Sequence, residues 1–153
     1  MAHDDGFLNV DLEIGASSRA KLAPLVQELQ GILFELFQGR IGRLYRAHYE
    51  ILGCGPAGAS ATIHELSSVI EGLGGAGRRA WNAAERREFN VGVELRRGQR
   101  AVELAIDADA VRRVAALGGR VAFTAYQEAA MPKATMSKAT KSRSAGPGRR
   151  AKT

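Results

Sequence analysis

The chain has 153 residues, of which 45% are hydrophobic, and this length and composition indicate one globular domain rather than a wholly disordered chain. A lone cysteine, Cys54, excludes an intramolecular disulfide, and no uncharged apolar stretch approaches the roughly 18 residues that span a bilayer. The first residues lack the basic start and apolar core of a secretory signal, so a cytoplasmic protein without a membrane partner is expected.

The net charge of +6 is concentrated at the C-terminal end. Seven of the 22 basic residues follow Ala129 and no acidic residue does, which leaves 15 basic and 16 acidic residues in 1–128. We therefore expect a nearly neutral domain over 1–128 and a disordered basic tail over 129–153, which has almost nothing to bury. Such a tail can contact nucleic-acid phosphate without sequence preference. The candidate contacts are Lys133, Lys138, Lys141, Arg143, Arg149, Arg150 and Lys152.

The N-terminal part of the chain is typical of a strand followed by a helix. Apolar side chains alternate with polar ones over 7–14, which predicts a strand with one buried face. Ser17 or Ser18 can cap the helix that follows, and Pro24 fits best in its first turn, where a missing N–H costs nothing.

Residues 32–37 allow two interpretations. The preceding helix can continue to residue 37, because the apolar residues stay on one helical face. Alternatively the helix ends near Gln30 with Gly31 as its cap, and 32–37 is a strand that turns through 39–42 into the next one. Glycines at both ends of that turn favour the hairpin.

The rest of the domain alternates between strand and helix patterns. The strand over 43–52 places Arg46, His48 and Glu50 on one face. Asp107 is expected to cap the last helix. The further elements expected are a helix over 60–72 with Ser60 as its cap, a polar segment around Trp81, a hairpin of 89–95 with 102–106, a helix over 108–117 and a closing strand over 121–126.

These strands alternate between apolar and polar residues, so each needs only one face covered. That pattern predicts an α+β fold whose antiparallel or mixed sheet carries helices on one face. An all-parallel sheet would instead show continuous apolar strands. A ferredoxin-like sandwich extended by one βαβ element is the simplest architecture that accommodates the predicted order.

The segment Gly53-x-Gly55-x-x-Gly58 resembles the phosphate-binding fingerprint of dinucleotide-binding proteins, and its Gly-Pro-Ala-Gly ending resembles the flavoprotein variant. The resemblance implies a nucleotide or flavin on the N-terminus of the next helix. The family also carries an acidic residue about 20 positions further on, at the end of the next strand. Here that strand offers only Glu94, so a glycine-rich connection is the favoured interpretation.

No residue pattern predicts a catalytic centre, a metal site or a bound cofactor. One cysteine and three histidines give no recognisable zinc spacing. Cys54 could be activated at a helix N-terminus with His48 as the nearest base, but a cysteine without catalytic function is favoured.

The segment Ala101–Tyr126 (AVELAIDADAVRRVAALGGRVAFTAY) resembles the ending of a bacterial domain-of-unknown-function family with repeated βαβ units, and Phe7–Ile14 shows a weaker match. The resemblance implies a fold, a bacterial origin and a role as a binding or immunity-type partner, and it brings no catalytic residues. The first hypothesis is therefore a non-enzymatic binding module that uses its sheet face or edge to hold an unknown protein partner. The alternatives are a nucleotide- or flavin-binding protein using Gly53–Gly58 and a nucleic-acid-associated protein acting through the tail.

Overall fold

The computed structural model describes residues 6–53 and 55–129, which form five strands and four helices. The strands are β1 (Phe7–Ala16), β2 (Leu33–Ile41), β3 (Leu44–Ile51), β4 (Arg86–Leu95) and β5 (Arg120–Gln127). The helices are α1 (Arg19–Leu29), α2 (Ala59–Glu71), α3 (Gly75–Ala83) and α4 (Ala108–Ala116).

All five strands belong to one mixed sheet with the order β2-β3-β1-β4-β5. The first four strands pair antiparallel in the ferredoxin-like arrangement, in which α1 connects β1 to β2 and the α2–α3 segment connects β3 to β4. The extra element is α4 followed by β5, which pairs parallel to β4 at the edge. The expected α+β architecture is confirmed.

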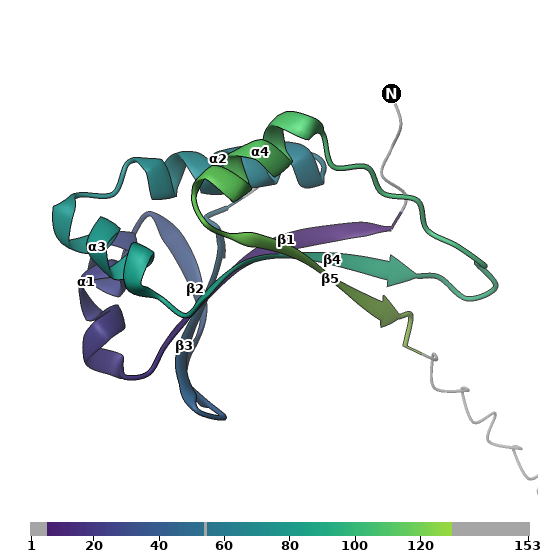
Figure 1. The fold of residues 1–153 in the computed structure, drawn as a ribbon. Helices are drawn as coiled ribbons and strands as arrows, with labels where there is room; N and C mark the ends of the chain where they lie inside the picture. Colours follow the sequence, from purple (N-terminus) through teal and green to yellow (C-terminus); the bar gives the residue numbers. More distant parts are fainter. Residues whose placement is uncertain (1–5, 54, 130–153) are drawn as a thin grey trace, which may run out of the picture.

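The helices lie on one side of the sheet, and the other side is left open (Figure 1). Val10, Leu12 and Ile14 of β1 point toward the helices and are completely or almost completely buried. Trp81 of α3 and Phe89 of β4 are the largest aromatic side chains of the same core and meet edge to face, with ring centroids 6.5 Å apart. The alternation in β1 therefore places Asp11 and its polar neighbours on the open side.

Residues 32–37 belong to a hairpin, as favoured. Helix α1 ends at Leu29, and Gly31 adopts a positive φ of 78° that a continued helix does not allow. The turn itself lies later than expected, at Gly42 and Arg43, whereas Gly39 is within β2.

The predicted strand over 102–106 is wrong. Residues 101–107 form no helix or strand, and the partner of β4 on that side is β5. Leu104 and Ile106 nevertheless pack against the core, whereas Glu103 between them is exposed. The alternation therefore indicates an extended segment with one buried face. Such a segment can pack against the core without pairing with a neighbouring strand.

The helix ends follow the sequence only in part. Ser18 and Asp107 are N-caps as expected, accepting from the backbone N–H groups of Lys21 and Ala110. Ser60 is not a cap, because Gly58 occupies that position. Pro24 lies beyond the first turn of α1, since the helix already begins at Arg19. No helix in the described parts of the chain is long and apolar enough to cross a membrane.

Candidate functional site

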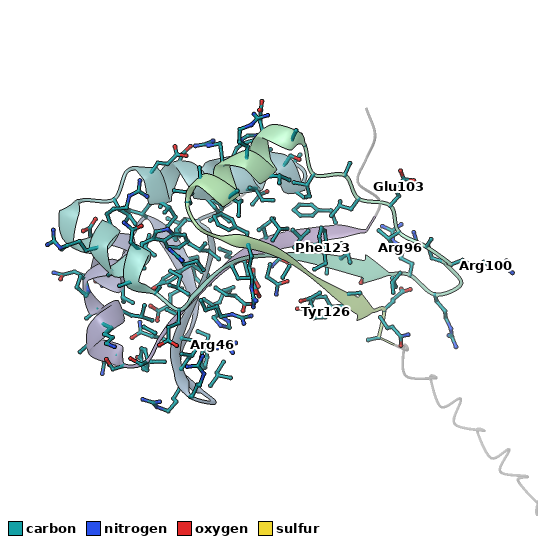
Figure 2. All side chains as sticks on the ribbon, in the orientation of Figure 1. Arg46, Arg96, Arg100, Glu103, Phe123 and Tyr126 are labelled. Carbon is teal, nitrogen blue, oxygen red and sulfur yellow. The ribbon has the colours of Figure 1, made fainter. Side chains whose placement is uncertain are left out.

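The side of the sheet away from the helices, here called the open face, carries most of the polar groups that the strands bring together. The strand register aligns His48, Glu13, Glu88 and Arg120 in one row across four strands. In Figure 2, Arg46 and Tyr126 point toward this side, and Phe123 points to the other side of β5. The open face comprises Phe34, Phe37 and Ile41 of β2, Arg46, His48 and Glu50 of β3, Asp11 and Glu13 of β1, Arg86, Glu88 and Asn90 of β4, and Arg120, Thr124 and Tyr126 of β5.

Two carboxylates lie buried at the centre of the open face. Glu13 is 7% exposed and Glu88 is 3% exposed, although no helix covers them. Arg86 lies between the two and binds both, with its Nη2 2.9 Å from Glu13 Oε2. Arg120 donates to Glu88 from the far side, and Asn90 Nδ2 donates to Glu13 Oε1 at 2.9 Å. Burial of these charges is tolerated because each carboxylate is paired and hydrogen-bonded.

The pKa values on the open face follow from burial and from these partners. Burial alone would raise the pKa of Glu13, but hydrogen bonds from Asn90 and Arg86 hold it below its ordinary value. Burial lowers the pKa of His48, and the positive charges of Arg46 and Arg86 act in the same direction against the charge of Glu13. The central row therefore contains an ionised Glu13 next to a neutral imidazole at neutral pH.

Asp11 is a carboxyl group of the open face with a strongly raised pKa. Burial raises its pKa to about 6, and the negative charges of Glu50 and Glu13 contribute. Asn9 Nδ2 donates to Asp11 Oδ1 at 2.8 Å. A carboxylic acid with this pKa changes its charge close to physiological pH, which is a common property of binding and catalytic sites.

Three buried nitrogen atoms of the open face have no hydrogen-bond partner among the described residues: Arg46 Nε, Arg86 Nε and His48 Nε2. His48 Nε2 lies 3.8 Å from Glu13 Oε2, too far for a hydrogen bond. The arginine Nε atoms are always donors, whereas the role of His48 Nε2 depends on its tautomer. Buried polar atoms are nearly always satisfied in folded proteins, so these three atoms are exceptions within the packing of the open face.

An apolar border runs along the β2 edge of the open face. Phe34 is 50% exposed, and Phe37 and Ile41 are exposed to nearly the same extent. The ring of Phe37 contacts the imidazole of His48, with centroids 5.4 Å apart. The ion-pair network and the exposed aromatic side chains thus form one continuous surface.

The glycine motif lies in the connection from β3 to α2, beside a cavity of about 220 Å³ lined in part by Gly53, Gly55 and Glu50. Gly53 and Gly58 have positive φ angles of 77° and 93°, so the turn requires glycine there for conformational reasons. Strand β3 is antiparallel to both of its neighbours, unlike the strand of a dinucleotide-binding βαβ unit.

The N-terminus of α2 is also occupied by a segment of the chain. The backbone N–H of Asp107 donates to Ser60 Oγ at 2.9 Å, and the Asp107 carboxylate lies 3.3 Å from His64 Nε2. A carboxylate at this position opposes the approach of a phosphate to the helix N-terminus. The local geometry gives no support to nucleotide or flavin binding through Gly53–Gly58.

The remaining candidate residues are divided between the described and the undescribed parts of the chain. Cys54 and the basic residues Lys133, Lys138, Lys141, Arg143, Arg149, Arg150 and Lys152 lie outside the described residues. Within the described residues, no group of three or more His, Cys, Asp or Glu side chains could hold a metal ion.

No protein-family model, curated protein or solved structure matches this chain. The resemblance of Ala101–Tyr126 to a bacterial domain-of-unknown-function family therefore stays a prediction. The set of residues that form the open face follows from the register and contacts of the described strands.

The sequence identified the polar faces of the strands but not the central network. Alternation placed Arg46, His48 and Glu50 together, and such faces are ordinarily exposed to solvent. The burial of Glu13 and Glu88 was missed, because it depends on arginines that only the strand register brings beside them. The available signal was the presence of opposite charges on the polar faces of several strands.

Proposed function

We propose that this chain is a small cytoplasmic, non-enzymatic protein-interaction module, of bacterial origin, and that the open face is its recognition surface. The observation that carries the proposal is that an uncovered sheet face combines a fixed arginine–glutamate network with exposed aromatic side chains. A partner that covers this face would bury the exposed apolar side chains beside charges that are already held in position.

Most of the helix side of the sheet is occupied by the hydrophobic core, although Val111 and Phe123 are exposed between α4 and β5. Leu22, Leu25, Ile63 and Leu66 of the helices are fully buried against the strands, so this side forms the hydrophobic core. The open face combines arginines with exposed aromatic rings, and these two residue types are enriched at protein interfaces.

The chemistry of the open face indicates the kind of partner segment. The arginines of the open face favour carbonyl or carboxylate oxygens, and Phe34 and Phe37 offer an apolar surface beside them. A polypeptide loop or extended segment that presents acceptor oxygens next to an apolar side chain meets both requirements. Glu13 and Glu88 are already paired and hold Arg86 in position.

The test is affinity capture with the full chain as bait, followed by mass spectrometry. We expect Arg46→Glu to lose the proteins that the unmodified chain enriches, whereas Arg79→Glu on the exposed surface of α3 retains them. Arg79 is the matched control because it is an exposed arginine remote from the sheet. Equal enrichment by both variants would show that the captured proteins do not use the open face and would contradict the proposal.

A second candidate function is supported by the position of the net charge. The domain over 1–128 carries 15 basic and 16 acidic residues, so attraction to nucleic acid would come from the residues that follow. We expect binding to non-specific DNA or RNA to weaken steeply with salt and to disappear when the chain is truncated after Glu128. Unchanged affinity after truncation would eliminate this function.

A further inference from the structure

The outer edge of β2 is the most apolar exposed region of the described structure. Five of the ten large apolar side chains that are exposed fall within residues 32–41: Ile32, Phe34, Leu36, Phe37 and Ile41. Strand β2 is the terminal strand of the sheet, so the backbone groups on its outer side have no strand partner. It contains neither proline nor lysine, which commonly prevent such edges from pairing.

We propose that β2 pairs antiparallel with β2 of a second copy of this chain, across a two-fold axis, to form a continuous ten-stranded sheet. The proposal concerns the edge of the sheet and does not depend on the recognition function proposed for the open face. We expect a second copy of the chain as the partner, because the charges and side-chain sizes along β2 are complementary to those of another β2 that runs antiparallel to it.

The bulge in β2 determines which register is possible. Leu36 is an extra residue between Glu35, which pairs with Tyr49, and Phe37, which pairs with His48. The side chains of Glu35, Gln38 and Arg40 therefore share the helix side of the sheet, and a hydrogen bond of 2.9 Å joins Gln38 to Glu35. Residues that lie opposite each other in an antiparallel pair point to the same side of the sheet. An allowed register must therefore pair open-face residues with open-face residues, and helix-side residues with helix-side residues, both before and after Leu36.

A register centred on Gln38 satisfies this condition. With Leu36 of each copy again left out of the pairing, it places Gln38 opposite the same residue of the second copy and Glu35 opposite the second copy's Arg40, twice by symmetry. Glu35 and Arg40 are the two charged residues of β2, and both are exposed. The pairing therefore joins each carboxylate to a guanidinium, whereas a parallel arrangement in register would place like charges together.

The apolar residues agree with the same register. On the open face it sets Phe34 opposite the second copy's Ile41, which covers two side chains that are 50% and 40% exposed in the single chain. It also sets Phe37 opposite the second copy's Gly39. Within one chain the ring of Phe37 already lies over Gly39, where a Cβ atom would be 2.9 Å from the end of the ring. An unrelated extended segment would have to reproduce all of these matches to compete.

Charge reversal tests the register directly. We expect the full chain to show a concentration-dependent monomer–dimer equilibrium in sedimentation velocity. Glu35→Arg and Arg40→Glu should each raise the dimer Kd about tenfold or more, because each creates two like-charged contacts. The double variant Glu35→Arg/Arg40→Glu restores the opposite-charge pairs and should recover most of the affinity. Phe34→Lys, which places a charge in the apolar contact, should also give a monomer.

The matched control is Glu85→Arg, which breaks the exposed ion pair with Arg43 without touching β2. It should leave the dimer Kd unchanged, and circular dichroism of every variant verifies folding. A chain that stays monomeric over the whole concentration series overturns the proposal. A dimer Kd that the single reversals do not change also overturns the proposal, and so does a Kd that the double variant does not restore. Either result indicates that another surface forms the dimer.

Discussion

The indole Nε1 of Trp81 donates a hydrogen bond of 2.9 Å to the backbone carbonyl oxygen of Leu117, and both groups are buried. Leu117 follows the last turn of α4, so this bond ties α3 to the α4–β5 element that extends the ferredoxin-like core. It spans 36 positions of the sequence and is formed only when the extra element packs onto the helix layer.

Trp81→Phe should destabilise the domain by about 1–3 kcal/mol, because it leaves the carbonyl oxygen of Leu117 buried without a donor and removes part of the indole volume. Urea denaturation followed by far-UV circular dichroism measures the change. Arg79→Ala on the exposed side of the same helix is the control and should change the free energy of unfolding by less than about 0.5 kcal/mol. Equal effects of the two variants would contradict the importance assigned to this bond.

Glu88→Ala should cost about 1–3 kcal/mol of stability, because Arg86 loses one of its two carboxylate partners and Arg120 loses its ion pair. The matched control is Glu85→Ala, which breaks an ion pair whose Arg43 is 81% exposed and should cost at most about 1 kcal/mol. Denaturant titration of both variants checks the difference. A small loss at Glu88 would mean that solvent reaches and screens these arginines.

The pH dependence of Asp11 has a defined sign. Its pKa in the folded chain is about 6, above the ordinary value of 3.8, so the folded state binds more protons than the unfolded state between these two values. Ionisation of Asp11 therefore lowers stability as the pH rises from about 4 to 6, and Asp11→Asn should remove this loss. Denaturation curves over that range test the sign, and a variant that loses stability in parallel with the unmodified chain would disprove it.

The charge of Glu50 is part of the cause, since it contributes to the raised pKa of Asp11. Glu50→Gln should lower the pKa of Asp11 in an NMR titration of the carboxyl carbon. Glu65→Gln, on the exposed side of α2, removes a carboxylate elsewhere and should leave the titration unchanged. Equal titration midpoints in all three proteins would leave burial and the charge of Glu13 as the causes.

Substitutions in the glycine motif distinguish a glycine that the backbone conformation requires from one that a bound ligand would require. Gly58→Ala should destabilise the chain by about 1–3 kcal/mol, because residue 58 has a φ of 93° that other residues reach only with strain. Gly55→Ala should be tolerated, since its Cβ would meet Ile51 at an ordinary distance of 3.5 Å. Thermal denaturation checks both variants. A thermal shift of the unmodified chain by dinucleotides that Gly55→Ala abolishes would instead indicate a ligand at this loop.

The strands and the division into a helix side and an open side followed from local sequence. In β3, the alternation of Tyr45, Ala47 and Tyr49 with Arg46 and His48 was enough, because each face meets a different environment over the whole strand. The glycines near residues 31 and 42 also carried a local signal, since both have positive φ angles.

The errors and omissions have a common physical origin in contacts between distant residues. Residues 102–106 alternate like a strand, but whether they pair with β4 is decided by α4 and β5, which bring a competing strand to that position. The burial of Glu13 likewise depends on Arg86 and Asn90, more than 70 positions away. A local sequence pattern does not show which distant residues come into contact, so the central network of the open face could not be predicted.

The double attachment of Arg86 has an evolutionary consequence. Because one guanidinium neutralises both Glu13 and Glu88, a chain that loses it retains two buried acids with a single arginine, Arg120, bound to one of them. Positions 13, 86 and 88 are therefore expected to change together. A related sequence with a neutral residue in place of Arg86 should carry an amide or an apolar side chain at one of the two acidic positions.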